Sequence, residues 1–339
     1  MTQAIASPAV HDLIGIGFGP SNLALAIEPI LHQQQVEALR VISRDALGEQ
    51  HVRTTRSVVV SAGGTPRIPE AFKALKGDSR VFHHSQYLER MASQPCVEGK
   101  AMRIAIIGGG QSAAEAFIDL NDSFPSVQVD MILRGSALKP ADDSPFVNEV
   151  FSPAFTDLVF QQEGAERERL VAEYQNTNYS AVDLDLIERI YGIFYRQKVS
   201  GIARQAFRTM TVVEKATPGP LGIELVLRNN ANGDTSVNHY DAVILATGYE
   251  RQTHRALLAP LEAYLGDFDV ARDYRIVTDE RCNAGIYIQR FSQASHGLSD
   301  TLLSVLPIRA DEIAASLYAL DRGRGKGRSV QDLLLATAS

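Results

Sequence analysis

Arg103-Ile-Ala-Ile-Ile-Gly-Gly-Gly-Gln-Ser-Ala-Ala-Glu-Ala-Phe117 is the stretch of sequence that decides the fold class. An apolar run typical of a buried strand leads into three glycines, and residues of helical composition follow. Val127 to Leu133 is a second apolar run, so the βαβ unit is complete. Glycines in such a turn let the backbone approach a pyrophosphate, to which the helix N-terminus offers free N–H groups. The pattern predicts an α/β fold with a Rossmann-like dinucleotide site around Gly109 and Gly110.

Arg134 stands where the nucleotide is selected, at the end of the second strand of this unit. An acidic residue there accepts the 2′-hydroxyl of the ribose, whereas an arginine accommodates a 2′-phosphate. Arg134 follows Gly110 by 24 residues (134 − 110), about the spacing that the motif needs. The sequence therefore favours NADPH over NADH, with a surface arginine that has no such role as the alternative.

A second glycine turn lies in Asp12-Leu-Ile-Gly-Ile-Gly-Phe-Gly-Pro-Ser-Asn22, again after an apolar strand. Leu23 to Ile27 is helical in composition, and Ser21 or Asn22 can cap that helix. Glu28-Pro29 would end it after few residues, because proline disrupts a helix interior. Two dinucleotide-type turns in one chain predict two doubly wound α/β domains.

This second unit lacks a clear following strand with an acidic end. Asp45, after Ala38 to Ser43, is one alternative as the ribose partner, 28 residues beyond Gly17 (45 − 17). The alternation of apolar and polar residues there fits a half-exposed ribbon better than a buried parallel strand. We therefore expect paired strands over residues 36–43 and 51–56, joined near Gly48.

Further elements are expected from composition. Two apolar strands end in glycine turns, at Val58–Pro66 and Asp241–Tyr249, and a β ribbon covers Thr211–Arg228. Residues 146–210 are helical in character, and the strand Ile286–Gln289 precedes a helix that opens at Ser299.

The bulk properties are those of a globular protein of 339 residues and 37.0 kDa, long enough for about two domains. A net charge of −7 argues against nucleic acid as a partner. Cys96 and Cys282 stand far apart outside any CxxC spacing, which argues against a disulfide scaffold or a zinc site and fits the cytoplasm. We find no signal peptide and no transmembrane segment in the sequence.

With these residues in view, the chain resembles the lysine and ornithine N-monooxygenases of siderophore biosynthesis, most closely the ornithine enzymes of pyoverdine-type pathways. The resemblance is carried by GIGFGPSN, SAGGTPRIP, VFHHSQYL, AIIGGGQSAAEAFIDLN, ADDSPFVNEVFSP, NTNYS, IERIYGIFYRQKVSG, DAVILATGYE and FSQASHGLSDTLLSVLP. It covers about residues 4–27 and 36–320. Between Ile27 and Glu28 the sequence lacks a large block of the family's FAD domain, which supplies the acidic ribose partner, loops around the isoalloxazine and a substrate-contacting lysine.

The resemblance implies a cytoplasmic enzyme that hydroxylates the side-chain amine of L-ornithine with FAD, NADPH and O2, and that can form a homo-oligomer. It implies a discontinuous, truncated FAD-binding domain at residues 1–75 and 241–325. The NADPH-binding domain would be residues 76–240, with a helical substrate-binding part at about 146–210.

The resemblance also assigns site residues. The cofactor-binding residues are Gly15, Gly17, Gly19, Asn22, Gly109, Gly110, Gln111, Ser112, Arg134, Asn178, Thr247, Gly248, Thr301, Leu302, Leu303 and Ser304. The substrate-binding residues are Asn148, Glu149, Val150, Phe151, Asn178 and Ser304. The flavin supplies the difficult chemical step, so we expect no acid–base triad and no metal.

Other interpretations stay open. A shortened chain could be a non-catalytic relic that keeps only NADP(H) binding, and a flavin-independent reductase is a third hypothesis. Asn148 could cap a helix, Asn178 could be a turn residue and Ser304 a packed helix residue.

Three histidines and one pair of aspartates could be taken for functional residues, but the sequence does not favour such roles. His83 and His84 are adjacent, so on a strand they face opposite sides and are poor joint metal ligands. His296 could line the flavin cleft or be structural. Asp142-Asp143, before Ser144-Pro145, is expected in a turn.

Overall fold

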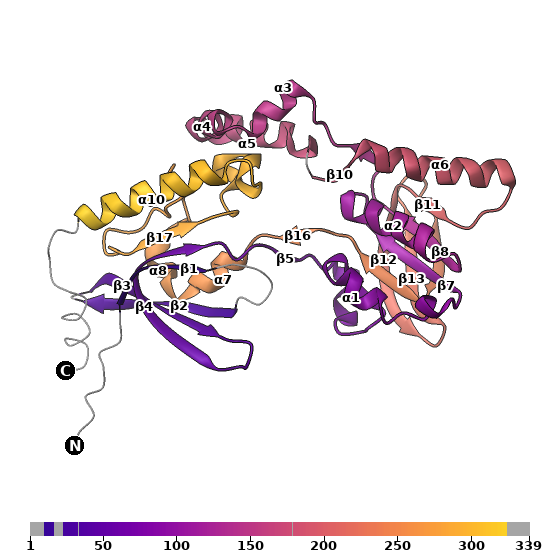
Figure 1. Ribbon diagram of the computed structural model, residues 1–339, viewed down its shortest axis with the longest axis horizontal. Helices are drawn as coiled ribbons and strands as arrows, with labels where there is room; N and C mark the ends of the chain where they lie inside the picture. The colour runs from indigo at the N-terminus through magenta and orange to yellow at the C-terminus, as the bar shows by residue number, and fades with distance from the viewer. Residues whose placement is uncertain (1–9, 17–22, 33, 178, 324–339) are drawn as a thin grey trace, which may run out of the picture. The chain divides into compact units, whose positions relative to one another are not determined.

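The computed structural model describes residues 10–16, 23–32, 34–177 and 179–323 (Figure 1). The chain divides into two compact units, each discontinuous in sequence. Unit 1 comprises Met1–Thr65, Asn148–Tyr174 and Glu250–Ser339, and unit 2 comprises Pro66–Val147 and Gln175–Tyr249. The chain passes between the units four times, so no single boundary along the sequence separates them.

Unit 2 is built on a five-stranded sheet in the order β11-β8-β7-β15-β6, and all its neighbouring strands are parallel. The strands are β6 (Val81–His83), β7 (Met102–Ile107), β8 (Val127–Ile132), β11 (Ala206–Arg208) and β15 (Ala242–Leu245). Helix α2 (Gln111–Ser123) connects β7 to β8. The predicted strand, glycine turn, helix and strand are therefore confirmed.

Both faces of this sheet are covered. Ile104 and Ile106 pack with Phe117 of α2 and with Ile190 of α6 (Leu184–Ser200), whereas Ala105 faces the opposite core. That core contains residues of an antiparallel sheet, β12 (Thr211–Gly219), β13 (Gly222–Asn229) and β14 (Thr235–Tyr240), which confirms the predicted ribbon. Burial on both faces explains why the parallel strands are apolar without alternation.

The helical segment 146–210 is divided between the units. Asn148–Tyr174 belongs to unit 1, and the part from Gln175 onward belongs to unit 2. Its elements besides α6 are α3 (Pro145–Asn148), η4 (Glu149–Phe151), α4 (Pro153–Gln161), α5 (Gly164–Glu173) and η5 (Gln175–Thr177).

Unit 1 contains a sheet in the order β1-β4-β3-β2, with β17 also paired to β4. The strands are β1 (Val10–Ile16), β2 (Leu23–His32), β3 (Gln35–Arg44), β4 (Gln50–Val60) and β17 (Gly285–Ile288). β1 and β17 run parallel to β4, whereas β2 and β3 form an antiparallel ribbon with it. The expected pairing of residues 36–43 with 51–56 is confirmed, and Gly48 in its turn has φ +87.

The predicted helix over Leu23–Ile27 is wrong, because these residues begin strand β2. A helix this short is unstable in isolation, and Pro29 would prevent its extension. β2 instead pairs with β3 and lies at the edge of the sheet, where a proline is tolerated. The backbone N–H and carbonyl groups of β2 thus find hydrogen-bond partners in the neighbouring strand β3.

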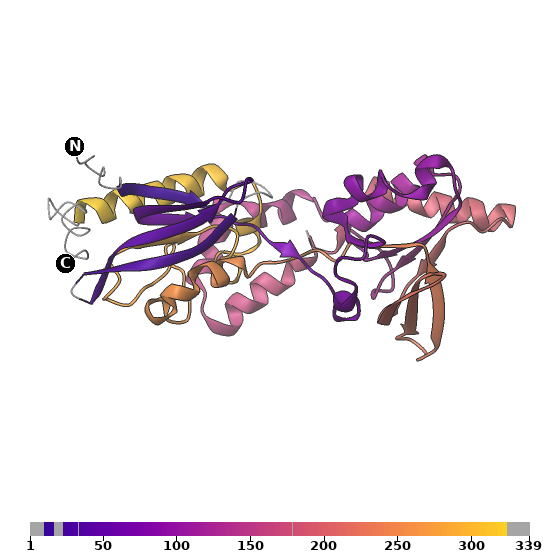
Figure 2. The ribbon, with the colours of Figure 1, turned by 90° about the horizontal axis from the view of Figure 1, so that it is seen from below.

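Helices lie on both sides of this sheet (Figure 2). Val58 and Val60 are fully buried against α7 (Thr253–Leu258), η6 (Ala259–Leu261) and α8 (Glu262–Leu265). Val59 packs on the other side with Ile313 of α10 (Leu306–Gly323). The Val58–Val60 part of β4 is therefore covered on both faces, although Leu13 of β1 is 44% exposed.

The C-terminal helix starts later than predicted. Leu298–Thr301 is the short 3-10 helix η7, Leu302 is extended with ψ 167, and α10 begins at Leu306. Arginine side chains bond the carbonyls of Asp300 and Thr301, which a continuing helix would have used internally. The remaining elements are α1 (Tyr87–Met91), α9 (Gln293–His296), η1 (Glu70–Leu75), η2 (His84–Gln86), η3 (Pro95–Glu98), β5 (Thr65–Pro66), β9 (Lys139–Pro140), β10 (Ala181–Val182) and β16 (Tyr249–Glu250).

Within the described ranges, none of the helices has the length and apolar character needed to cross a bilayer.

Candidate functional site

The glycine turn after β7 is shaped so that side chains are excluded from it. Gly108 has φ +149, and a Cβ atom there would lie 2.3 Å from the Ala246 carbonyl oxygen. A Cβ at Gly109 would lie 3.0 Å from Leu133 Cδ1. The close approach of this turn to its neighbours therefore requires glycine at residue 108 and leaves little space at residue 109.

Helix α2 begins directly after this turn, with Gly110 as its N-cap. The N–H groups of Ala113 and Ala114 both donate to the Gly110 carbonyl, at 3.0 and 3.2 Å. The two preceding N–H groups, of Gln111 and Ser112, occupy the first helical positions, where an α-helix leaves its donors without intrahelical acceptors. Together with the positive end of the helix dipole they form a site suited to a phosphate.

The side chain of Gln111 is already engaged inside unit 2. Its amide nitrogen donates to Asp183 Oδ2 at 2.7 Å, and its amide oxygen accepts the Asp183 N–H at 2.9 Å. Asp183 is the N-cap of α6, so this pair ties the first turns of α2 and α6 together. The side chain of Gln111 therefore positions α6, and only its backbone N–H is left for the predicted contact with a nucleotide.

Arg134 lies where the nucleotide-selection argument requires it. It follows β8, whose last residue Ile132 pairs with Ile107 at the end of β7. Its side chain is exposed, and it stands at the same sheet edge as the glycine turn. A cation at this edge can meet the 2′-phosphate of a nucleotide bound at the turn.

Thr247 and Gly248 form the turn at the carboxyl end of β15. Gly248 has φ +74, and its carbonyl accepts the Arg67 N–H and a hydrogen bond from His83 Nε2, both at 2.9 Å. Thr247 Oγ1 donates to the Arg67 carbonyl. Because β6, β7, β8 and β15 are parallel, this turn lies at the same sheet edge as Gly108–Gly110.

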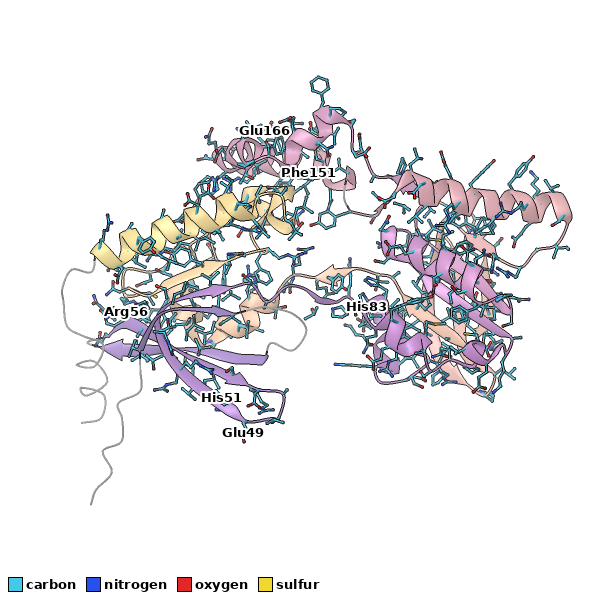
Figure 3. All side chains as sticks on the ribbon, viewed as in Figure 1. Glu49, His51, Arg56, His83, Phe151 and Glu166 are labelled. Atoms are coloured by element: carbon cyan, nitrogen blue, oxygen red, sulfur yellow. The ribbon has the colours of Figure 1, made fainter. Side chains whose placement is uncertain are left out.

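His83, which is labelled in Figure 3, holds this turn through a hydrogen bond between its Nε2 and the Gly248 carbonyl. Its Nδ1 accepts the Ser85 N–H at 3.2 Å, so Nε2 carries the proton that is donated to Gly248. Burial lowers the pKa of His83, which keeps the ring neutral. Sequence reasoning rightly disfavoured a metal-binding role for His83 but missed its contact with Gly248 and the contact of Arg67 with Thr247, because these contacts join residues 165 and 180 positions apart.

In unit 1 the parallel strands β1, β4 and β17 bring their carboxyl ends to one edge. Gly15 lies within β1, paired with Val59, and a Cβ there would meet no atom within 4 Å. The predicted pyrophosphate residues Gly17, Gly19 and Asn22 lie outside the described residues. Since β2 replaces the expected helix, residues 23–32 offer no helix N-terminus to a flavin pyrophosphate.

The segment from Thr301 to Ser304 lies at this edge of unit 1. The Thr301 carbonyl accepts a hydrogen bond at 3.2 Å from Arg290, which follows β17. Leu303 is 75% exposed, and Ser304 Oγ donates to the Phe151 carbonyl at 3.3 Å. The structure thus brings the predicted flavin-contacting segment, including Leu302, next to the predicted substrate wall.

The substrate wall itself is only partly exposed. Asn148 ends α3 and is exposed, as is Glu149, whereas Phe151 is half-buried. Val150 is 3% exposed, so its side chain belongs to the core. Asn178, the remaining predicted substrate residue, lies outside the described residues.

A buried ion pair fixes the backbone before Thr301. Arg309 Nη1 lies 2.6 Å from the Asp300 carbonyl oxygen and 3.2 Å from Asp300 Oδ1, and both side chains are almost fully buried. The Asp300 carboxylate also accepts the N–H groups of Ser292 and Arg290. Burial raises the pKa of Asp300, while these donors and Arg309 oppose the rise. The sequence gives no signal for this pair, because an aspartate and an arginine nine residues apart are common.

His296 is structural rather than exposed to a cleft. It is fully buried, its ring stacks on Tyr274 with centroids 4.2 Å apart, and its nitrogens contact the Arg272 carbonyl and Ser295 Oγ. Burial lowers its pKa to about 4. Asp142 accepts the Ser144 N–H at 3.1 Å in the local turn that was expected, and hydrogen bonds from the side chain and then the N–H of Ser144 lower the pKa of Asp142.

Asp45 is not a ribose partner. β3 runs antiparallel to β4, and Asp45 lies in the turn before β4, at the end of that strand opposite its carboxyl edge. Its carboxylate accepts the N–H groups of Leu47 and Glu49 and contacts His51 Nε2 at 2.8 Å, and the His51 bond is the main reason that the pKa of Asp45 is lowered. The ligand atoms of Asp45, Glu49 and His51 lie within 4.8 Å of one another, but those of Asp45 are engaged in the turn (Figure 3).

The amino-acid sequence was compared with protein families and with known relatives. The family model for L-lysine 6-monooxygenase/L-ornithine 5-monooxygenase matches residues 27–251. The L-ornithine N(5)-monooxygenase of Pseudomonas aeruginosa is 71% identical over 313 residues, which are 92% of this chain and 71% of that protein. That of Burkholderia cepacia is 47% identical over 82% of this chain and 64% of its own length. The chain thus spans about two thirds of the length of these relatives.

Solved structures agree with the sequence comparison. The ornithine hydroxylase of Pseudomonas aeruginosa superimposes with a TM-score of 0.83 at 71% identity, covering 88% of this chain and 70% of that one. The Kutzneria sp. 744 ornithine N-hydroxylase, solved with reduced FAD, NADP+ and L-ornithine, gives a TM-score of 0.80 at 30% identity over 87% of this chain and 71% of that one. The chain therefore belongs to the L-lysine 6-monooxygenase/L-ornithine 5-monooxygenase family.

Proposed function

We propose that this chain uses NADPH, FAD and O2 to hydroxylate the side-chain amine of L-ornithine, as a step in siderophore biosynthesis. The observation that carries the proposal is the meeting of Gly108–Gly110, Arg134 and Thr247–Gly248 at one edge of a parallel sheet. That geometry supports a dinucleotide with a 2′-phosphate, the cofactor that the family membership implies. The ornithine relatives support the choice of substrate.

The two cofactors fit the described residues to different extents. For NADPH, the side-chain-free turn, the start of α2 and the exposed Arg134 are all in place. For FAD, unit 1 offers the carboxyl ends of β1, β4 and β17 and the segment Thr301–Ser304, but no helix follows β1 within residues 23–32. Flavin retention is therefore the property on which the proposal depends most.

Bound FAD, reduced by NADPH, would supply the oxygen chemistry. The residues of the chain have a different task, which is to hold the amino acid with its amine able to act as a nucleophile. A free alkyl amine has a pKa of about 10.4, so at neutral pH it must lose a proton first. The exposed amide of Asn148 could orient the substrate without adding a negative charge that would favour the protonated amine.

The first experiment is a visible absorption spectrum of the purified chain with added FAD, followed by NADPH. We expect a bound-flavin spectrum that bleaches on reduction, and then hydroxyornithine formation with ornithine but much less product with lysine. Gly108→Val serves as the control: its side chain cannot fit beside Ala246, so it should retain flavin but lose bleaching by NADPH. Well-folded protein that retains no flavin would contradict the proposed activity.

A further inference from the structure

The turn between β11 and β12 holds the residues on either side of Arg134. The Met210 N–H donates to the Gly135 carbonyl at 2.9 Å, and the Thr211 N–H donates to the Leu133 carbonyl at 3.0 Å. Two successive N–H groups thus bind both neighbours of Arg134, while the side chain of Arg134 itself stays exposed.

Met210 adopts a backbone conformation that is unusual for its residue type. Its φ is +52, in the left-handed region that glycine favours and asparagine tolerates. In an extended strand successive N–H groups point to opposite sides, whereas a left-handed turn residue lets its own N–H and the next one converge. This conformation therefore directs the N–H groups of Met210 and Thr211 to the same short loop. A strained residue persists where its surroundings hold it in place, and such residues are concentrated at functional segments.

Hydrogen bonds on both sides of the turn keep Met210 in this conformation. The Met210 carbonyl accepts the Asn230 N–H at 2.6 Å, which ties it to the end of β13. Just before the turn, Arg208 Nε donates to Asp130 Oδ2 at 2.9 Å. The buried Asp130 carboxylate also accepts the Tyr240 hydroxyl at 2.8 Å. The turn is thus supported by the core of unit 2 and by the antiparallel sheet.

Leu133 connects this support to the glycine turn after β7. It is 4% exposed, and its Cδ1 would lie 3.0 Å from a Cβ at Gly109. The backbone that carries Arg134 is therefore placed against the glycine turn on one side and against the Met210 turn on the other. A guanidinium recognises a phosphate through N–H groups in a fixed geometry, so the placement of this backbone affects affinity.

We propose that the left-handed turn at Met210 positions Arg134 for the 2′-phosphate of NADPH, and so contributes to the choice of NADPH over NADH. The inference rests on the proposed function, in which Arg134 meets that phosphate. Met210 acts through the backbone of Leu133 and Gly135 and is a positioning residue.

Substitutions that differ in their tolerance of positive φ test this role. A β-branched residue disfavours the left-handed conformation, so Met210→Val should move the turn and weaken NADP+ binding about tenfold. NAD+ binding should change by no more than about twofold, because NAD+ has no 2′-phosphate for Arg134 to bind. Isothermal titration calorimetry of the full chain with NADP+ and with NAD+ measures both affinities without any flavin turnover.

Met210→Asn is the rescue variant. Asparagine tolerates the left-handed conformation, so NADP+ affinity should stay within about twofold of that of the original chain although the side chain is lost. Met210→Thr is also β-branched, and its polar side chain suits this half-buried position. It takes the place of Met210→Val if circular dichroism shows that Met210→Val is unfolded.

Gln34→Val is the matched control for strain. Gln34 is exposed and has φ +67 in the turn between β2 and β3 of unit 1. We expect Gln34→Val to lower the thermal midpoint much as Met210→Val does, because both place a β-branched residue at positive φ. It should leave both nucleotide affinities unchanged.

A double-mutant cycle with Arg134→Ser shows whether the turn acts through Arg134. Once Arg134 is replaced, Met210→Val should weaken NADP+ binding no further, because the group that the turn positions is absent. Equal weakening of NADP+ and NAD+ binding, failure of Met210→Asn to retain affinity, or additive effects in the cycle would each overturn the inference.

The Arg134→Ser variant also separates this inference from the proposed function. If Arg134→Ser weakens NADP+ binding and Met210→Val does not, the positioning role is wrong and the role of Arg134 stands. If Arg134→Ser itself leaves NADP+ binding unaltered, the proposed recognition of the 2′-phosphate is wrong and the positioning role falls with it.

Discussion

Arg134 is the exposed residue on which we predict the choice between NADPH and NADH to depend. It makes no contribution to the core, yet it stands at the edge where a nucleotide bound at Gly108–Gly110 would place its 2′-phosphate. Hydrogen bonds to charged groups contribute about 1.5–3 kcal/mol, which corresponds to about a 10- to 100-fold change in binding.

We therefore expect Arg134→Ser to raise the KM for NADPH by about 10- to 100-fold while leaving the KM for NADH nearly unchanged. The KM values for NADPH and NADH are measured from the steady-state oxidation of each nucleotide at saturating flavin. Arg189→Ser, on the surface of α6 and paired with Asp122, is a matched control that should alter neither value. An equal effect on both nucleotides would mean that Arg134 does not read the 2′-phosphate.

His296 links the stability of unit 1 to pH. Its pKa is lowered to about 4 by burial, from an ordinary value of about 6.5, so the unfolded chain binds the proton more tightly. The stabilising effect of the neutral ring is present above pH 6.5 and is lost as the pH falls from about 6.5 to 4. The difference corresponds to about 3 kcal/mol for this residue.

Urea unfolding between pH 7 and 4.5 measures this dependence. We expect the free energy of unfolding to fall with pH, and His296→Gln to be less stable at pH 7 but to show a shallower fall. The exposed His239→Gln is the control that should keep the original slope. A slope unaltered by His296→Gln would show that the ring does not titrate as described.

At the scale of elements, the segment from η7 to α10 depends on one buried ion pair. Asp300 and Arg309 join the start of this segment to the first turn of α10, and they hold the backbone that leads into Thr301–Ser304. Breaking a buried pair by removing one partner leaves an uncompensated charge, which costs about 3–5 kcal/mol.

Arg309→Met should therefore lower the free energy of unfolding by about 3–5 kcal/mol, and Asp300→Asn/Arg309→Met should recover part of that loss because the charge is removed. Chemical denaturation of the three proteins provides the comparison. Flavin affinity should follow the same order if the pair positions Thr301–Ser304. A double variant less stable than Arg309→Met would contradict this account of the pair.

In the ribbon β2–β3–β4, one prediction from the sequence was confirmed and another was wrong. Alternation over residues 36–43 correctly predicted a half-exposed strand, because one face of a ribbon is buried and the other is not. Leu23–Ile27 has helical composition, yet the open edge of β3 offers backbone partners that a helix ending at Pro29 could not replace. Local propensity is weak where a neighbouring strand is available.

At the scale of the whole molecule, both units are assembled from distant parts of the chain. The carboxyl edge in unit 2 is completed by Thr247–Gly248, which His83 and Arg67 hold through contacts across about 165 and 180 residues. Such contacts have no local signature, and so the sequence could name the turn but not the residues that fix it.

The amino-acid sequence by itself determined the class of fold, the glycine turn at Gly108–Gly110 and the place of Arg134 just after the second strand of that unit. These depend on short-range rules, namely strand and helix periodicity and the steric need for glycine near a ligand. Only the tertiary structure decided that β2 is a strand, that Val58 and Val60 are covered, and that Asp300 and Arg309 form a buried pair. Those outcomes depend on which surfaces meet after folding, because burial and backbone pairing are properties of the packed chain rather than of any segment.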